Sequence, residues 1–432
     1  MVFVDSVFGV LSQPLGGILG AAVATATIGL LAIMFRRGRA PQHRLRAAIA
    51  ICGFVLSAGL AAPYALTASR YETARGPYGV QQAILVLPSL ASDRYPAPVL
   101  MQIWFPVKGA ANPPSTLKAC AQLQFLPLAD AGNPARLVLY MPHFGSLRTD
   151  NTARLSYLAS YGYVVVAFDD IAQDFALPGA TPEEEEARLR MWHVLTQPDF
   201  DKTLRLDDIR VKLQAEKALS GLSRLAACAV VLSSSHWKTS VVYTHVGFLG
   251  YSFGGSTAAE ATVMDSRIVA VVNLDGALFG QARLGRLTVP YLYVMSDRPI
   301  PTMSMMMSKD PDERYGSRID ALDRHEQVRL ASRNGSAGIL IKGSVHASLS
   351  DAALQPHLSR LWLFENPIAF FNAVNLYTLD FFDIHLRGQN VIPIDRILPT
   401  SPVARTFAEI GMIPDRHFAL PPSPNANRTT AP

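Results

Sequence analysis

From Gly79 onward, short apolar runs alternate with longer stretches whose apolar residues recur at helical spacing. Runs such as Ala135–Pro142 and Gly162–Asp170 are almost continuously apolar, which is typical of central strands covered on both faces. Residues 79–88 and 97–107 predict the two strands of an N-terminal hairpin. Further strands are predicted at residues 245–252, 268–275, 289–297 and 337–344.

Helical patterns fall between these predicted strands, at residues 148–161, 206–222 and 256–265. Strands that alternate with helices in this way predict a mostly parallel sheet with helices packed on both of its faces. The predicted fold class is therefore α/β.

Two uncharged stretches precede this domain, Ser6–Phe35 and Ala47–Ser69. Each can cross the hydrocarbon layer of a bilayer as a helix, which takes about 20 apolar residues. The segment between them carries five arginines. Because arginines gather on the cytoplasmic side of short loops, we expect a transmembrane hairpin with its loop inside and both ends outside. Its helices are predicted at about residues 7–35 and 47–69.

Two alternatives remain open for the N-terminal region. Pro14 and the glycines at 16, 17 and 20 would suit a first segment that lies partly in the membrane interface. The second segment has the arginine-rich flank and small residues of a cleaved signal sequence, although signal peptides lie at the extreme N-terminus. Either way, the rest of the chain is expected to be exported.

The chain therefore divides into three predicted parts: an N-terminal membrane region (1–70), a catalytic domain (71–392) and a C-terminal tail (393–432). After about Ile392 the chain turns proline-rich and polar and ends in LPPSPNANRTTAP, so the whole tail is expected to be poorly ordered.

Charge and cysteine content narrow the classes of function. The formal net charge is +5, and the hairpin loop alone contributes five arginines, so no basic stripe indicates a nucleic-acid partner. No CxxC pair, HExxH motif or acidic calcium loop is present, so no metal site is expected. Cys52 lies in the second uncharged segment, which leaves Cys120 and Cys228 as a pair that an exported location would permit to bond.

The strongest chemical signal is the motif Gly250-Tyr251-Ser252-Phe253-Gly254. A strand is predicted before this G-x-S-x-G motif and a helix after it, which is the setting of a nucleophilic serine on a sharp strand-to-helix turn. Flanking glycines keep side chains from colliding in the turn, and the start of the helix offers N–H groups where negative charge develops. Ser252 is the predicted nucleophile.

A serine nucleophile needs a base that is oriented by an acid. In this fold the chain order is serine, acid, histidine. His346 follows the last predicted core strand in a Gly/Ser loop, whereas the other downstream histidines lie in helical or charged stretches or near the C-terminus. His346 is the predicted base. Asp275 and Asp297 each end a predicted strand, and either can be the acid on this evidence.

The stretches GYSFGGSTAAEA, VVNLDGALFG and IKGSVHASLSD together resemble the platelet-activating-factor acetylhydrolase group of α/β-hydrolases. The resemblance extends over roughly Gly76–Gln389. It implies an α/β-hydrolase fold and a reaction that needs no cofactor. It also implies that the acid is Asp275, which follows a leucine as the family's acid does. Related cutinase-like and dienelactone-hydrolase-like enzymes carry the acid one strand later, which corresponds to Asp297.

The resemblance also implies an oxyanion hole made of two backbone N–H groups, those of Phe253 and of Phe144 in the loop YMPHFGSLRTD. His143 in this loop departs from the glycine that the family usually has there.

The resulting hypothesis is a membrane-anchored serine ester hydrolase, with its catalytic domain on the extracytoplasmic side, that acts on short or modified acyl esters, including lipid esters. One alternative is a broad carboxylesterase or polyester hydrolase. An alternative of another class is a membrane-tethered α/β-hydrolase domain without activity that serves as a binding module.

Overall fold

The computed structural model describes residues 76–91, 93–94, 97–109, 115–117, 122, 128–129, 134–174, 176–190, 199–231, 237, 241–354, 367–388 and 402–412. The predicted transmembrane helices at 7–35 and 47–69 lie outside these residues. Among the described helices, none combines the length and apolar character that crossing a membrane requires.

The chain separates into two units, Met1–Ala74 with Ala352–Ile368 and Arg75–Asp351 with Ala369–Pro432. The second unit is an α/β domain built on a ten-stranded sheet in the order β10-β9-β8-β7-β6-β4-β5-β2-β1-β3. Its strands are β1 (Gly79–Leu87), β2 (Val99–Val107), β3 (Ser115–Leu117), β4 (Ala135–Met141), β5 (Val164–Phe168), β6 (Val241–Tyr251), β7 (Ile268–Leu274), β8 (Tyr291–Ser296), β9 (Ala337–Ile341) and β10 (Ala404–Thr406).

The strand hairpin predicted at residues 79–88 and 97–107 and the parallel centre of the sheet are both confirmed. β1 and β2 pair antiparallel over their whole length, and β2 pairs antiparallel with β5. From β5 through β4, β6, β7 and β8 to β9, every neighbouring pair is parallel.

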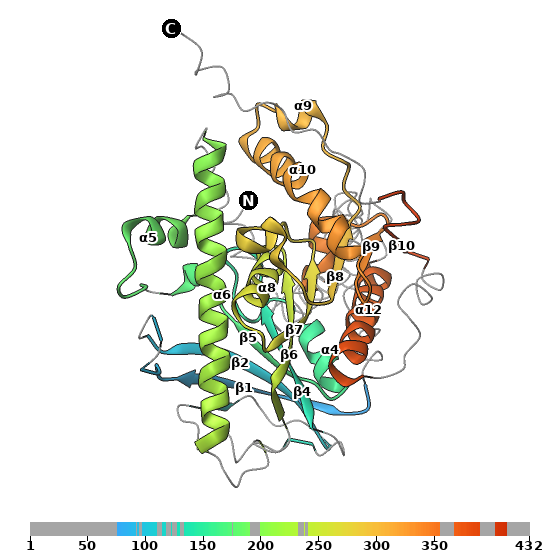
Figure 1. Ribbon diagram of the computed structural model, residues 1–432. Coiled ribbons are helices and arrows are strands. Elements are labelled where there is room, and N and C mark those ends of the chain that lie inside the picture. The colour runs from blue at the N-terminus through green and yellow to red at the C-terminus, as the bar shows by residue number, and fades with distance from the viewer. Residues whose placement is uncertain are drawn as a thin grey trace, which may run out of the picture. The chain divides into compact units, whose positions relative to one another are not determined.

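Helices connect these strands and cover the sheet (Figure 1). The described α-helices are α4 (Thr152–Ser160), α5 (Pro182–Leu189), α6 (Phe200–Val231), α8 (Phe253–Met264), α9 (Met303–Met306), α10 (Pro311–Ala331) and α12 (Pro367–Arg387). Short turns of other helix types lie at η2 (Ile171–Gln173), η4 (Ala282–Arg286), η5 (His346–Leu349) and η6 (Asp351–Leu354).

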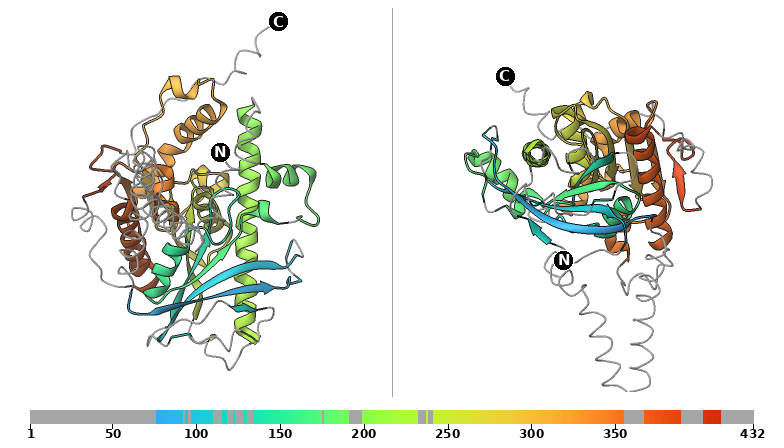
Figure 2. Two further views of the ribbon diagram at one scale, coloured as in Figure 1. Left: turned by 180° about the vertical axis from the view of Figure 1, so that it is seen from behind. Right: turned by 90° about the horizontal axis from the view of Figure 1, so that it is seen from below.

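The core has two halves, one on each face of the sheet, because successive side chains of a strand point to opposite faces. On β4, Leu137 and Leu139 pack with residues of α6 and α8, whereas Val138 and Tyr140 pack with residues of α4 and α12. Figures 1 and 2 show α6 and α12 on opposite flanks of the strands. This double covering explains why the central strands are almost continuously apolar in sequence.

The last described segment differs from the poorly ordered tail expected after residue 392. Within 402–412, β10 pairs antiparallel with β9, and Phe407 is buried with its ring 5.8 Å from that of Tyr293. Gly338 leaves the space for this ring, since a Cβ there would lie 2.4 Å from it. Residues 402–412 of the tail therefore add the edge strand β10 to the sheet, and Phe407 is buried against the sheet.

Cys228, on α6, is buried and disulfide-bonded. The chain has three cysteines, and the other two, Cys52 and Cys120, lie outside the described residues.

Candidate active site

The three residues predicted to act together all follow carboxyl ends of parallel strands. Ser252 follows β6, Asp275 follows β7, and His346 lies in the loop after β9. Because β6, β7, β8 and β9 are parallel neighbours, these ends meet at one edge of the sheet.

Ser252 occupies the sharp turn between β6 and α8. Its backbone has φ 56° and ψ −125°, outside the regions that residues with a side chain normally adopt. The turn is held by two hydrogen bonds, from Ser252 N to the Leu274 carbonyl (2.8 Å) and from Gly255 N to the Ser252 carbonyl (2.8 Å). Ser252 therefore stands at the N-terminus of α8, where the first N–H groups lack intrahelical partners.

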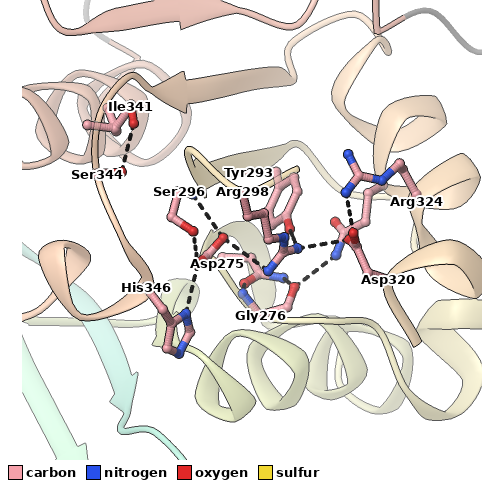
Figure 3. A network of polar contacts seen from close by, with 12 residues as sticks. Asp275, Gly276, Tyr293, Ser296, Arg298, Asp320, Arg324, Ile341, Ser344 and His346 are labelled. Atoms are coloured by element: carbon pink, nitrogen blue, oxygen red, sulfur yellow. Dashed lines mark hydrogen bonds and ion pairs between the residues drawn. The ribbon is translucent and has the colours of Figure 1, made fainter. Parts of the chain in front are cut away.

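His346 and Asp275 are hydrogen-bonded partners, with Nδ1 2.7 Å from Oδ2 (Figure 3). The side chain of Asp275 is fully buried, whereas that of His346 is 47% exposed. Within the described part of the chain, the Ser252 hydroxyl makes no hydrogen bond to the imidazole. Such bonds often form only in the complex with substrate.

Asp275 receives further support from the end of β8. Ser296 donates its backbone N–H to Oδ1 (2.9 Å) and its hydroxyl to Oδ2 (2.6 Å), and Arg298 Nη1 lies 3.4 Å from Oδ1. Burial alone would raise the pKa of Asp275, but Arg298, His346 and Ser296 outweigh burial and lower that pKa to about 2. Asp275 is therefore ionised at any working pH.

Asp297, the alternative acid, does not contact the imidazole. It is exposed, and its carboxylate accepts a hydrogen bond from Gly343 N (2.8 Å) while its own N–H donates to the Ser344 carbonyl (3.1 Å). These bonds join the end of β8 to the loop that carries His346. Asp297 therefore stabilises the position of the loop that carries His346.

Tyr251 is a site residue that sequence reasoning missed. Its ring stacks on the His346 ring with centroids 5.0 Å apart, and its hydroxyl donates to the His346 carbonyl (3.1 Å). The ring of His143 lies edge-on to the same tyrosine at 5.8 Å. Tyr251 occupies the first x position of the G-x-S-x-G motif, where the motif specifies no residue type. The sequence therefore gives no indication that it contacts His346.

The side chains of Phe144 and Phe253, the two residues predicted to supply the oxyanion donors, are in contact. Phe144, in the loop after β4, packs its ring edge-on to that of Phe253 at 5.3 Å. Arg210, fully buried on α6, places its guanidinium 3.8 Å from the centre of the Phe144 ring. The same guanidinium pairs with Asp170 and donates to the Ala187 carbonyl (3.0 Å) at the end of α5. Arg210 thereby ties the Phe144 loop to α5 and α6.

His143 stands where the family resemblance implies a glycine. Its Nδ1 lies 3.0 Å from the Phe144 carbonyl, and its Nε2 lies 3.8 Å from Asp150 Oδ2. Its side chain is 45% exposed. These contacts place His143 in the turn that holds the backbone of Phe144 in position.

Comparison with known proteins gives one family. The family described as "Platelet-activating factor acetylhydrolase, isoform II" matches residues 132–358, which is more than half of the chain and includes Ser252, Asp275 and His346. The match is shorter than the range Gly76–Gln389 over which the sequence resembles that family. A comparison with curated proteins finds no match.

The solved structures that this chain matches include a ferulic acid esterase from Streptomyces cinnamoneus. It shares 18% sequence identity with this chain, covers 76% of this chain and 96% of its own, and has a TM-score of 0.47.

Proposed function

This chain belongs to the platelet-activating factor acetylhydrolase, isoform II family of ester hydrolases, and on that premise we propose that it cleaves carboxylic esters through an acyl-enzyme on Ser252. The observation that carries the proposal is the 2.7 Å bond between His346 Nδ1 and Asp275 Oδ2, at the sheet edge where the turn presents Ser252. A base oriented by a buried carboxylate is what a serine nucleophile requires.

In the proposed mechanism, His346 Nε2 takes the hydroxyl proton of Ser252 as the oxygen attacks the ester carbonyl. Asp275 holds Nδ1–H and stabilises the imidazolium that forms. The ester C–O bond then breaks, and His346 gives the proton to the leaving alcohol. Water, activated by His346, attacks the acyl-enzyme and releases the acid and the free serine.

The tetrahedral intermediate carries a negative oxygen that must be stabilised. We assign this role to the backbone N–H groups of Phe253 and Phe144. The packing of Phe144 between Phe253 and Arg210 supports the assignment, since it fixes the loop that would present the second donor. Loss of one such donor costs about 10²- to 10³-fold in rate.

The proposed substrates are esters with short or modified acyl groups, including those of lipids. We further propose that residues 1–70 anchor the chain in a membrane, with the α/β domain on the extracytoplasmic side. Two observations support this location: the uncharged stretches that flank an arginine-rich loop, and the disulfide at Cys228, which is typical of oxidising compartments.

The test compares 4-nitrophenyl acetate and 4-nitrophenyl palmitate as substrates of the full-length chain. Turnover of the acetate that exceeds turnover of the palmitate supports the short-acyl assignment. Ser252→Ala is expected to lower the rate at least about 10³-fold. Ser304→Ala, which alters an exposed serine in α9, is the matched control and should keep the wild-type rate. Equal rates for wild type and Ser252→Ala would exclude the mechanism.

A further inference from the structure

A row of alternating charges runs from the proposed base into helix α10 (Figure 3). His346 bonds Asp275, Asp275 faces Arg298 at 3.4 Å, and Arg298 Nη2 lies 3.1 Å from Asp320 Oδ1. Asp320 in turn pairs with Arg324, one helical turn further along α10. The guanidinium of Arg298 thus lies between two carboxylates, one of which orients the imidazole.

Arg298 lies just after the end of β8. In cutinase-like enzymes the acid lies at the end of the corresponding strand. Here that strand end supplies partners for the acid instead: Ser296 donates two hydrogen bonds to Asp275, and Arg298 supplies the cation. Arg298 Nη2 also donates to the Tyr293 hydroxyl (2.8 Å), so the guanidinium is fixed from three directions.

The charge of Arg298 opposes protonation of the imidazole. A carboxylate favours the imidazolium, and a cation on the far side of that carboxylate weakens this effect. The groups that act most strongly on Arg298 are Tyr293 on β8, Asp275 after β7, and Asp320 and Asp323 on α10; His346 and Arg324 bind the same carboxylates, Asp275 and Asp320. Its side chain is 31% exposed, so solvent reduces the interaction without removing it.

We propose that Arg298 is a positioning residue that holds Asp275 against His346 and sets the pH above which His346 can accept the Ser252 proton. This inference rests on the proposed function, because it assigns the base and the acid as above. It predicts that the charge of Arg298 determines the acidic limb of the pH profile.

The experiment measures kcat/KM for 4-nitrophenyl acetate with the full-length chain between pH 5 and 9. In Arg298→Gln the acidic limb should move to higher pH by about one unit, because a nearby positive charge is lost. The rate on the alkaline plateau should fall by no more than about tenfold, since Ser296 still holds Asp275. Arg298→Lys keeps the charge and should restore the limb to near its wild-type position.

The matched control is Arg333→Gln. Arg333 is also a partly buried arginine, but it bonds the carbonyls of Leu287 and Val289 before β8, at the opposite edge of the sheet. This variant loses the same charge and should leave the limb unmoved. A loss of activity in Arg298→Gln that is equal at every pH, or a limb that moves to lower pH, would overturn the proposal.

A second readout does not need turnover. The titration midpoint of the His346 ring, followed by NMR and identified by its absence in His346→Gln, should be higher in Arg298→Gln than in wild type. An unchanged midpoint would contradict the role of Arg298. A chain that hydrolyses no ester while the midpoint still moves would refute the proposed function and leave the electrostatic coupling established.

Discussion

The glycines around Ser252 illustrate how single residues permit the site. A Cβ on Gly254 would lie 2.0 Å from the Met141 carbonyl oxygen, and one on Gly250 would lie 1.9 Å from the Gly254 carbonyl oxygen. Backbone atoms cannot move aside as a flexible side chain can. The strained Ser252 conformation therefore depends on neighbours that have no side chain.

Gly254→Ala should both destabilise the protein and abolish ester turnover, because the added methyl group meets the β4 backbone. We expect a loss of at least about 3 kcal/mol in the free energy of unfolding, measured in urea. Gly316→Ala is the control, since its Cβ in α10 meets nothing within 4 Å. This change should stabilise the helix by up to about 1 kcal/mol. Similar outcomes for the two variants would refute the steric argument.

Asp275 makes a prediction about the pH dependence of stability. Its pKa of about 2 in the folded protein lies below the value of about 3.9 in an unfolded chain. The stabilisation is therefore present above about pH 4 and is lost as the pH falls through about 2. Wild type should exceed Asp275→Asn in free energy of unfolding by a pH-dependent part on the order of 2 kcal/mol. A difference that stays constant between pH 6 and 3 would contradict the lowered pKa.

Among the elements, the apolar and helical patterns predicted most of the fold. The strand pattern at 268–275 corresponds to β7 (Ile268–Leu274), and the helical pattern at 256–265 falls within or next to α8 (Phe253–Met264). The helical pattern at 206–222 underestimated α6, which extends over Phe200–Val231. Helix ends depend on tertiary packing that a local pattern does not contain.

The candidate site was predictable only in part, for the same reason. The motif between a predicted strand and a predicted helix indicated Ser252, the chain order and a loop position indicated His346, and the family resemblance favoured Asp275 over Asp297. The partners of Asp275 could not be predicted, because Ser296 and Arg298 reach it through the pairing of β7 with β8. Contacts between residues far apart in sequence require the sheet order, which the sequence pattern leaves open.

Arg210 gives an element-scale prediction, because one buried side chain joins α6, α5 and the Phe144 loop. Arg210→Met leaves Asp170 buried without its cation, and the free energy of unfolding should fall by about 3–5 kcal/mol. The double variant Asp170→Asn/Arg210→Met should lose less than the sum of the two single losses. Thermal and urea unfolding of the three variants measure this coupling. Strict additivity would show that the ion pair is not the interaction that matters.

At the scale of the whole molecule, the disulfide at Cys228 links the long helix α6 to another part of the chain. Cys228→Ser should lower the free energy of unfolding by about 2–5 kcal/mol, as is typical for loss of a native disulfide. Either Cys120→Ser or Cys52→Ser should reproduce this loss, and the other should leave the stability unchanged. An unaltered urea midpoint in Cys228→Ser would refute a stabilising disulfide.

Covalent labelling can show whether Ser252 is the nucleophile that His346 and Asp275 activate. Diethyl 4-nitrophenyl phosphate reacts with activated serines, and mass spectrometry of the digested, full-length protein identifies the modified peptide. We expect one adduct per chain, on Ser252, and a labelling rate strongly reduced in His346→Gln. An unlabelled Ser252, or a label on another serine that persists in Ser252→Ala, would contradict this assignment.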